Sequence, residues 1–151
     1  MEGVTDAPMR AVLTERGGFD FCVTEFIRVT DSELPAKVFY RYVPELKSGS
    51  CTPSGTPVIV QLLGGDPERL AQNAQVAVRL GAKGIDLNFG CPAPTVNRHD
   101  GGATLLKFPE RIRKIVETVR IALPPFITVS AKLRLGWENP QDILRNATEA
   151  A

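Results

Sequence analysis

The chain has 151 residues, of which 43% are hydrophobic and 23% are charged, a composition typical of one water-soluble globular domain with a core. Its net charge of +1 gives no sign of nucleic-acid binding, although a basic face can lie within a neutral total. No apolar run reaches the ~18 residues of a membrane span, and the cysteines form no Cys-x-x-Cys pair, so we expect a metal-free protein of the reducing cytoplasm with no membrane partner.

The first third of the chain predicts a helix, a strand and an irregular excursion. Residues 7–16 carry a short helical pattern that ends at two glycines. The β-rich segment 19–29 is typical of a strand. Residues 31–56 contain three prolines and an aromatic patch, so we expect a loop with room for one short helix.

The rest of the chain alternates apolar strands with amphipathic helices. Residues 57–63 and 84–90 are typical of buried strands, and Asp66 before Pro67 predicts the N-cap of the helix between them. This alternation predicts right-handed βαβ units and a parallel sheet. The remaining predicted elements are a loop over 93–108, a helix from Pro109, a strand over 127–135 and a helix capped by Asn139.

A partial (β/α)8 barrel is the fold that this order favours. No Gly-x-Gly-x-x-Gly motif follows the first strand, which disfavours a dinucleotide-binding sheet. A complete TIM barrel needs about 250 residues, so we expect residues 1–151 to form roughly its N-terminal half, an incomplete catalytic domain. Such a half would expose apolar helix faces and a sheet edge.

Residues 84–92 are the stretch around which the chain is organised. Asp86 and Asn88 alternate with three apolar residues and therefore share one face of a strand, which then breaks at a Gly90-Cys91-Pro92 corner. Two unpaired polar side chains in a buried strand would cost a few kcal/mol. We therefore expect this face to meet a ligand or a polar barrel interior.

Polar residues occur at the ends of four successive predicted strands. In a TIM barrel the carboxyl ends of the strands carry the active residues, so these side chains should converge. Some of them could instead only satisfy each other inside the barrel. The residues are Arg28, Gln61, Asn88 with Cys91, and Lys132 with Arg134.

The types of these residues suggest a cofactor. An inward Lys132 is costly unless it meets an anion or an electron-rich ring, which favours an anionic or redox-active cofactor. The alternative is a buried ion pair with Asp86. Gln61 and Asn88 can each donate and accept, which suits the amide edge of a heterocycle.

Cys91 is the candidate acid. It has no neighbouring His or Lys in sequence to form a thiolate, and an ordinary thiol with a pKa near ~8.5 is mostly protonated at neutral pH, so it could act as a general acid. Cys22, in the middle of the predicted strand, is interpreted as a structural cysteine. His99 is the only histidine, and we interpret it as an inert loop residue.

Six segments of the chain resemble the tRNA-dihydrouridine synthases, in particular the bacterial subgroup that acts on uridine 16 of the D-loop. The pair Asn-x-Gly-Cys-Pro and Lys-x-Arg-x-Gly is the most specific part, and the match covers essentially the whole chain. The segments are Met1-Glu2-Gly3-Val4-Thr5-Asp6, Thr24-Glu25-Phe26, Val60-Gln61-Leu62-Leu63-Gly64, Asp86-Leu87-Asn88-Phe89-Gly90-Cys91-Pro92, Gly101-Gly102-Ala103-Thr104-Leu105-Leu106 and Lys132-Leu133-Arg134-Leu135-Gly136-Trp137.

The resemblance implies an FMN-dependent reductase on a TIM barrel, with NADPH as reductant and tRNA as substrate. Hydride would reach C6 of the uracil ring and Cys91 would protonate C5. Matching positions imply flavin contacts by Met1, Glu2, Gly3, Gln61 and Lys132, contacts of Asn88 with both flavin and uridine, and tRNA orientation by Arg28 and Arg134. The full-length protein would be a monomer.

The chain lacks the later strands of the family's barrel and its C-terminal helical tRNA-binding domain, so by itself it should be inactive. Two other hypotheses stay open. One is another FMN barrel that reduces a free pyrimidine, such as a dihydroorotate dehydrogenase. The other is a residual RNA-binding or structural piece without flavin.

Overall fold

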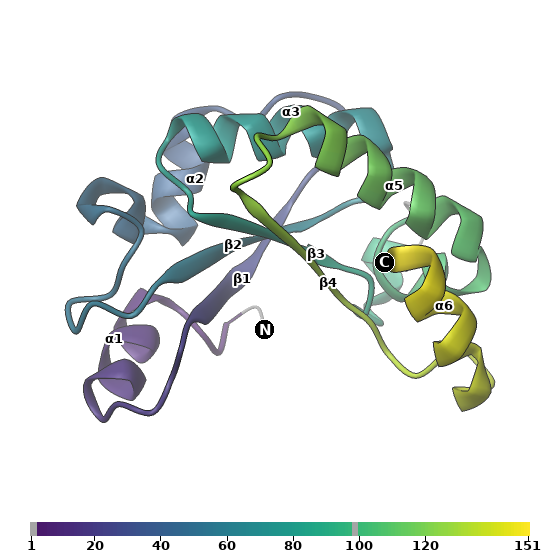
Figure 1. The fold of residues 1–151 in the computed structure, drawn as a ribbon, viewed down its shortest axis with the longest axis horizontal. Coiled ribbons are helices and arrows are strands. Elements are labelled where there is room, and N and C mark those ends of the chain that lie inside the picture. The colour runs from purple at the N-terminus through teal and green to yellow at the C-terminus, as the bar shows by residue number, and fades with distance from the viewer. Residues whose placement is uncertain (1–2, 98–99) are drawn as a thin grey trace.

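The fold is a parallel β-sheet whose strands alternate with helices. The computed structural model describes residues 3–97 and 100–151. The sheet contains β1 (Cys22–Arg28), β2 (Val58–Leu63), β3 (Gly84–Asn88) and β4 (Thr128–Lys132), and the strands lie side by side in chain order (Figure 1). All three pairings are parallel, which confirms the predicted βαβ architecture and the α/β class.

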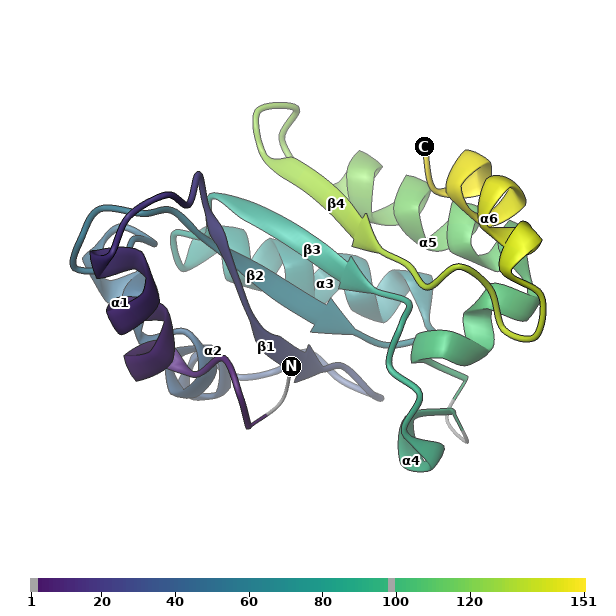
Figure 2. The same ribbon diagram turned by 90° about the horizontal axis from the view of Figure 1, so that it is seen from below.

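One face of this sheet is covered by helices, above all by two long ones. α3 (Pro67–Arg79) packs against α5 (Pro109–Ala122), and both lie on the same side of the sheet. Figure 2 shows the sheet from its other side, with α3 and α5 behind the strands. No helix within the described ranges is long and apolar enough to cross a bilayer. The α-helices are α1 (Ala7–Glu15), α2 (Ala36–Tyr42), α3 (Pro67–Arg79), α4 (Pro94–Asn97), α5 (Pro109–Ala122) and α6 (Ile143–Ala150), and the 3-10 helices are η1 (Pro44–Ser48), η2 (Gly102–Lys107) and η3 (Pro140–Asp142).

Strand alternation divides the sheet into an apolar and a polar face. Ile85 and Leu87 of β3, with exposures of 0% and 1%, belong to the core under the helices. Their neighbours Asp86 and Asn88 therefore point to the other face. The helix α3 begins as predicted, because the Asp66 side chain accepts a hydrogen bond from the Arg69 N–H at 2.8 Å.

Two predicted strands are shorter in the structure. The predicted strand 127–135 ends at Lys132, because its partner β3 ends opposite it at Asn88 and the chain then turns away at Gly90. The predicted strand 19–29 covers only Cys22–Arg28, so Cys22 begins the strand and is not in its middle. Cys22 is half-buried, and burial raises the pKa of its thiol, as expected for a structural cysteine.

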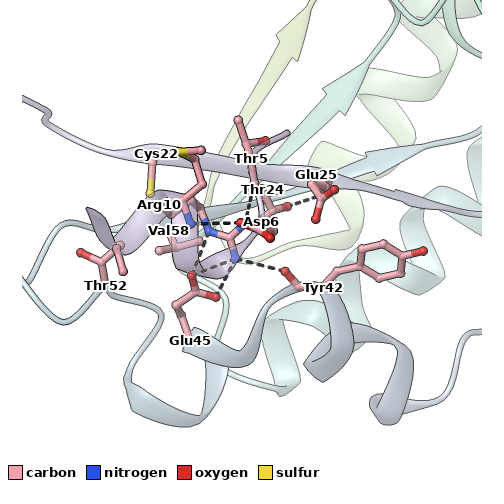
Figure 3. A network of polar contacts seen from close by, with 12 residues as sticks. Thr5, Asp6, Arg10, Cys22, Thr24, Glu25, Tyr42, Glu45, Thr52 and Val58 are labelled. Atoms are coloured by element: carbon pink, nitrogen blue, oxygen red, sulfur yellow. Dashed lines mark hydrogen bonds and ion pairs between the residues drawn. The ribbon is translucent and has the colours of Figure 1, made fainter. Parts of the chain in front are cut away.

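A buried ion pair attaches the N-terminal segment to the rest of the fold (Figure 3). The Arg10 side chain, 2% exposed, donates to both oxygens of Glu45 at 2.8 and 2.9 Å. The same guanidinium donates to the carbonyls of Thr5 and Tyr42. Arg10 of α1 thus connects the loop before α1 to α2 and η1, and its donors are matched by four acceptor atoms.

Loss of this arginine should strongly destabilise the fold. Arg10→Met leaves Glu45 as an unpaired buried charge, so the free energy of unfolding should fall by about 3–5 kcal/mol. The measurement is denaturant unfolding of the protein that contains residues 1–151, with and without the substitution. The matched control is Arg79→Met: Arg79 forms an exposed pair with Glu33 at 3.6 Å, and its loss should cost less than about 1 kcal/mol. Equal effects of the two substitutions would contradict the structural role of the buried pair.

Candidate active site

The polar face of the sheet forms a cavity of about 680 Å³. This lies within the range of about 300–1,000 Å³ that is typical of small-molecule sites. All four strands contribute to its wall, as do Thr5 and the Gly90-Cys91-Pro92 corner. The structure therefore brings together most of the residues that sequence analysis selected: Gln61, Asn88, Cys91, Lys132 and Arg134.

The register of the parallel strands places polar side chains next to each other. Gln61 lies opposite Asp86, and Asp86 lies opposite Ser130. The Gln61 amide donates to Asp86 Oδ2 at 2.7 Å, and the Ser130 hydroxyl donates to Asp86 Oδ1 at 2.6 Å. The Asp86 carboxylate is thus the common acceptor of two neighbouring strands.

The same set of hydrogen bonds continues to the cysteine corner. Asn88 Nδ2 donates to Gln61 Oε1 at 2.8 Å. Asn88 Oδ1 accepts from the backbone N–H groups of Gly90 and Cys91 at 2.9 and 3.0 Å. We call Ser130, Asp86, Gln61 and Asn88 the polar chain. It links β4, β3 and β2 to the backbone of Cys91.

The members of the polar chain on β2 and β3 are buried, with exposures of 4% for Gln61, 6% for Asp86 and 8% for Asn88. These side chains hydrogen-bond to each other, which is one of the alternatives that the sequence analysis left open. Each amide nitrogen nevertheless carries a second N–H, for which the described residues supply no acceptor. Gln61 and Asn88 both line the cavity, so a ligand there could accept hydrogen bonds from these amides.

Among the residues that the structure describes, Asp86 is the one carboxylate in the cavity wall. Burial raises its pKa above the usual value, and the hydrogen bonds from Ser130 and Gln61, together with the positive charge of Lys132, oppose that rise. The net effect is a carboxyl group that resists ionisation more than an exposed aspartate does.

Cys91 is fixed by contacts with two other segments. Its N–H donates to Asn88, and its carbonyl accepts from the Ala103 N–H at 2.9 Å. Gly102 has φ +61°, and a Cβ at this position would lie 2.6 Å from the Cys91 carbonyl oxygen. The Gly101-Gly102-Ala103 segment therefore requires glycine at 102 so that it can approach the cysteine corner.

Lys132 lies at the cavity without a direct ion pair among the described residues. Its Nζ would be 3.3 Å from a Cβ added at Gly90, which places the ammonium beside the cysteine corner. Sequence analysis gave a buried ion pair between Lys132 and Asp86 as the alternative, and the described residues show no such pair. The side chain is exposed, so the desolvation cost expected for an inward lysine is small here.

The two arginines contact the segment that follows β3. Arg134, at the cavity, donates from Nε to the Gly90 carbonyl at 2.6 Å. Arg28 donates to the Thr95 carbonyl at 3.1 Å and lines a separate cavity of about 460 Å³. The structure therefore places Arg134 in the site and Arg28 beside it.

The predicted flavin-contacting loop is described only in part. Met1 and Glu2 lie outside the described residues, as does His99. The Gly3 N–H donates to Glu25, and Thr5 lines the cavity. Gly3 is exposed and is not part of the cavity wall.

Sequence analysis assigned no site role to Thr24 or Ser130. The pairing of β1 with β2 shifts between Val23 and Phe26, and there the Thr24 hydroxyl accepts from the Gln61 N–H at 3.0 Å. A bulge of this kind leaves no periodic signal in the sequence. Ser130 alternates with apolar residues, which is consistent with its place on the polar face, but its acceptor depends on the strand register.

Comparisons with known proteins agree on one family. The Dihydrouridine synthase (Dus) family model matches residues 1–151. A tRNA-dihydrouridine(16) synthase of Vibrio vulnificus is 61% identical over 142 residues, which are 94% of this chain and 45% of that protein. Proteins of the same name from Ralstonia nicotianae and Neisseria meningitidis are 55% and 53% identical over the whole chain, which covers 46% and 45% of them. The chain spans about half the length of these curated relatives.

The raised pKa of Asp86 predicts a pH-dependent cost to stability. The folded state holds the Asp86 proton more tightly than the unfolded state does, so this carboxyl group reduces the free energy of unfolding as pH rises from 3.8 through its folded pKa. Asp86→Asn removes this term. The variant should gain stability relative to the parent over that pH range, as measured by denaturant unfolding at several pH values.

The control for the loss of one negative charge is Asp20→Asn at an exposed position. A stability difference between Asp86→Asn and the parent that stays constant from pH 4 to neutral pH, or that shifts in favour of the parent as pH rises, would contradict the raised pKa of Asp86.

Proposed function

Because the chain belongs to the dihydrouridine synthase family, we propose that the protein it forms reduces a uridine of tRNA, uridine 16 of the D-loop, to 5,6-dihydrouridine. The observation that carries the proposal is the convergence of Gln61, Asn88, Cys91 and Lys132 on one cavity at the carboxyl ends of parallel strands. The names of the relatives support tRNA as the substrate. The chain would supply the first half of a TIM barrel that works in the cytoplasm as a monomer.

The residues of the cavity fit a flavin. An isoalloxazine ring presents carbonyl oxygens and ring nitrogens along one edge, and the free N–H groups of Gln61 and Asn88 are donors of the kind that such an edge requires. The Lys132 ammonium, beside Gly90, would favour a reduced, anionic ring. When bound, FMN that NADPH has reduced would supply hydride to C6 of the uracil. We propose that Gln61, Asn88 and Lys132 hold it, with the segment Met1-Glu2-Gly3.

Cys91 would supply the proton that completes the reduction. As the hydride adds at C6, the thiol proton passes to C5, and the 5,6 double bond becomes a single bond. The half-buried thiolate would then take a proton from solvent. Asn88 and Ala103 hold the backbone on both sides of this residue, so the thiol stays at the cavity wall.

The two arginines would orient the tRNA. Each guanidinium uses only part of its five N–H donors on a backbone carbonyl. The remaining donors and the charge suit phosphate oxygens, which position a nucleic acid without reading its sequence. Arg134 would act next to the target base, and Arg28 would act at the neighbouring cavity.

Removal of the thiol tests the chemistry. In the longest polypeptide that contains residues 1–151, Cys91→Ala should lower the rate of dihydrouridine formation in unmodified tRNA by about 10²-fold or more, while FMN binding is retained. Mass spectrometry of the digested tRNA measures the product. The control is Cys51→Ala, a half-buried cysteine outside this cavity, which should keep the parental rate. A fully active Cys91→Ala enzyme would remove the cysteine from the mechanism, and faster turnover of free orotate than of tRNA would reject the substrate.

The cofactor assignment has its own test. Lys132→Met should raise the Kd for FMN by about tenfold or more, because the variant loses a charged contact worth about 1.5–3 kcal/mol. Quenching of flavin fluorescence on titration of the apoprotein gives this Kd. Lys37→Met, an exposed lysine of α2, is the control and should bind FMN like the parent. The same Kd for both variants would mean that Lys132 does not contact the flavin.

A further inference from the structure

The polar chain has a fixed direction that starts at the cysteine corner. The backbone N–H groups of Gly90 and Cys91 can only donate, so Asn88 must turn its oxygen toward them and its nitrogen toward Gln61. Gln61 must then turn its oxygen to Asn88 and its nitrogen to Asp86. Reversal of either amide would place two donors or two acceptors against each other.

The polar chain ends at the Asp86 carboxylate, which accepts a hydrogen bond at each of its two oxygens. Asp86 takes one hydrogen bond from Gln61 at 2.7 Å and one from Ser130 at 2.6 Å. It is buried and lines the cavity, but the proposed reduction uses none of its atoms. A leucine at this position would avoid the desolvation of a carboxylate but would leave the Gln61 amide without its acceptor, so the role of Asp86 lies in the hydrogen bonds that it accepts.

We propose that Asp86 is a positioning residue: as the terminal acceptor of the polar chain, it holds the side-chain amides of Gln61 and Asn88 in the single orientation that offers N–H groups to a ligand. The cavity is thereby selective for a planar heterocycle that presents carbonyl oxygens or ring nitrogens. The identity of that heterocycle as a flavin or a uracil rests on the proposed function, whereas the orientation of the amides does not.

Without an acceptor at residue 86, the effect should reach Cys91. Gln61 would lose the partner of its nitrogen and could rotate, so that its oxygen could face the cavity in place of an N–H. Asn88 would then lose its fixed acceptor, and the turn that it caps at Gly90 and Cys91 would loosen. A residue with only a local structural role would not change groups two hydrogen bonds away.

The choice of variants follows from the acceptor role. Asp86→Asn can keep an oxygen toward Gln61 and turn its nitrogen toward Ser130, whose hydroxyl can also accept. Asp86→Leu has a similar size but offers no acceptor at all. Ser130→Ala removes the other donor to Asp86 and leaves the Gln61 bond intact, so it is the matched control.

The first experiment uses NMR and needs no flavin. It compares the side-chain amide signals of Gln61 and Asn88 and the backbone N–H signal of Cys91 in the longest polypeptide that contains residues 1–151. In Asp86→Asn all three signals should shift, by amounts that decrease from Gln61 to Cys91, because a neutral amide is a weaker acceptor than a carboxylate. In Ser130→Ala they should stay near their parental positions. Unchanged Asn88 and Cys91 signals in Asp86→Asn would overturn the proposal, and this result does not depend on whether Asp86→Leu folds.

The second experiment measures flavin affinity and catalysis. Asp86→Leu should raise the Kd for FMN by about tenfold or more and should lower kcat as well, whereas Asp86→Asn should stay within about threefold of the parent in both. Rescue by asparagine separates the acceptor role from the negative charge. Parental Kd and kcat in Asp86→Leu, or an equal loss in Asp86→Asn, would overturn the proposal. A parent that binds no FMN would instead reject the proposed function, and the NMR comparison would still decide the role of Asp86.

Discussion

The register between β2, β3 and β4 is the constraint on which the site depends. It sets Gln61, Asp86 and Ser130 side by side on the face away from α3 and α5. Gln61 and Asp86 are buried, so leaving their polar atoms unpaired would be costly, and at this spacing they bond to each other and to Ser130. The hydrogen bonds that result fix Gln61 and Asn88, and through them the backbone of Cys91. A slip of one residue in any strand would turn these side chains into the helix layer.

The site and the core are built from the same strands, so stability and function are coupled. In β3, Ile85 and Leu87 pack under the helices, whereas Asp86 and Asn88 line the cavity. Burial of Asp86 works against folding at neutral pH, and the core residues of the same strand compensate for it. A protein under selection for stability alone would replace this carboxylate, which is why its hydrogen bonds point to a role in the site.

Local patterns in the sequence predicted the elements and the faces, but not the contacts between distant segments. The alternation in residues 84–90 placed Asp86 and Asn88 on one face, and Asp66 marked the start of α3. The Arg10–Glu45 pair joins residues that are 35 positions apart and has no periodic signature. The end of β4 at Lys132 was also beyond local patterns, because it depends on where the partner strand turns. Roles for Met1 and Glu2 stay predictions, since these residues lie outside the described ranges.

The arrangement around Cys91 meets two demands that the proposed role of proton donor makes. Its backbone is held by the Asn88 oxygen on one side and by the Ala103 N–H on the other, and Gly102 permits the close approach. The residue is nevertheless only half-buried, so solvent could return a proton to the thiol if it acts as the proposed acid. Arg134, bound to the neighbouring Gly90 carbonyl, adds a positive charge at the same corner although the net charge of the chain is only +1. The fold therefore holds the Cys91 backbone in place and leaves its thiol accessible. It also places positive charge at the edge of the cavity, where a polyanionic substrate would arrive.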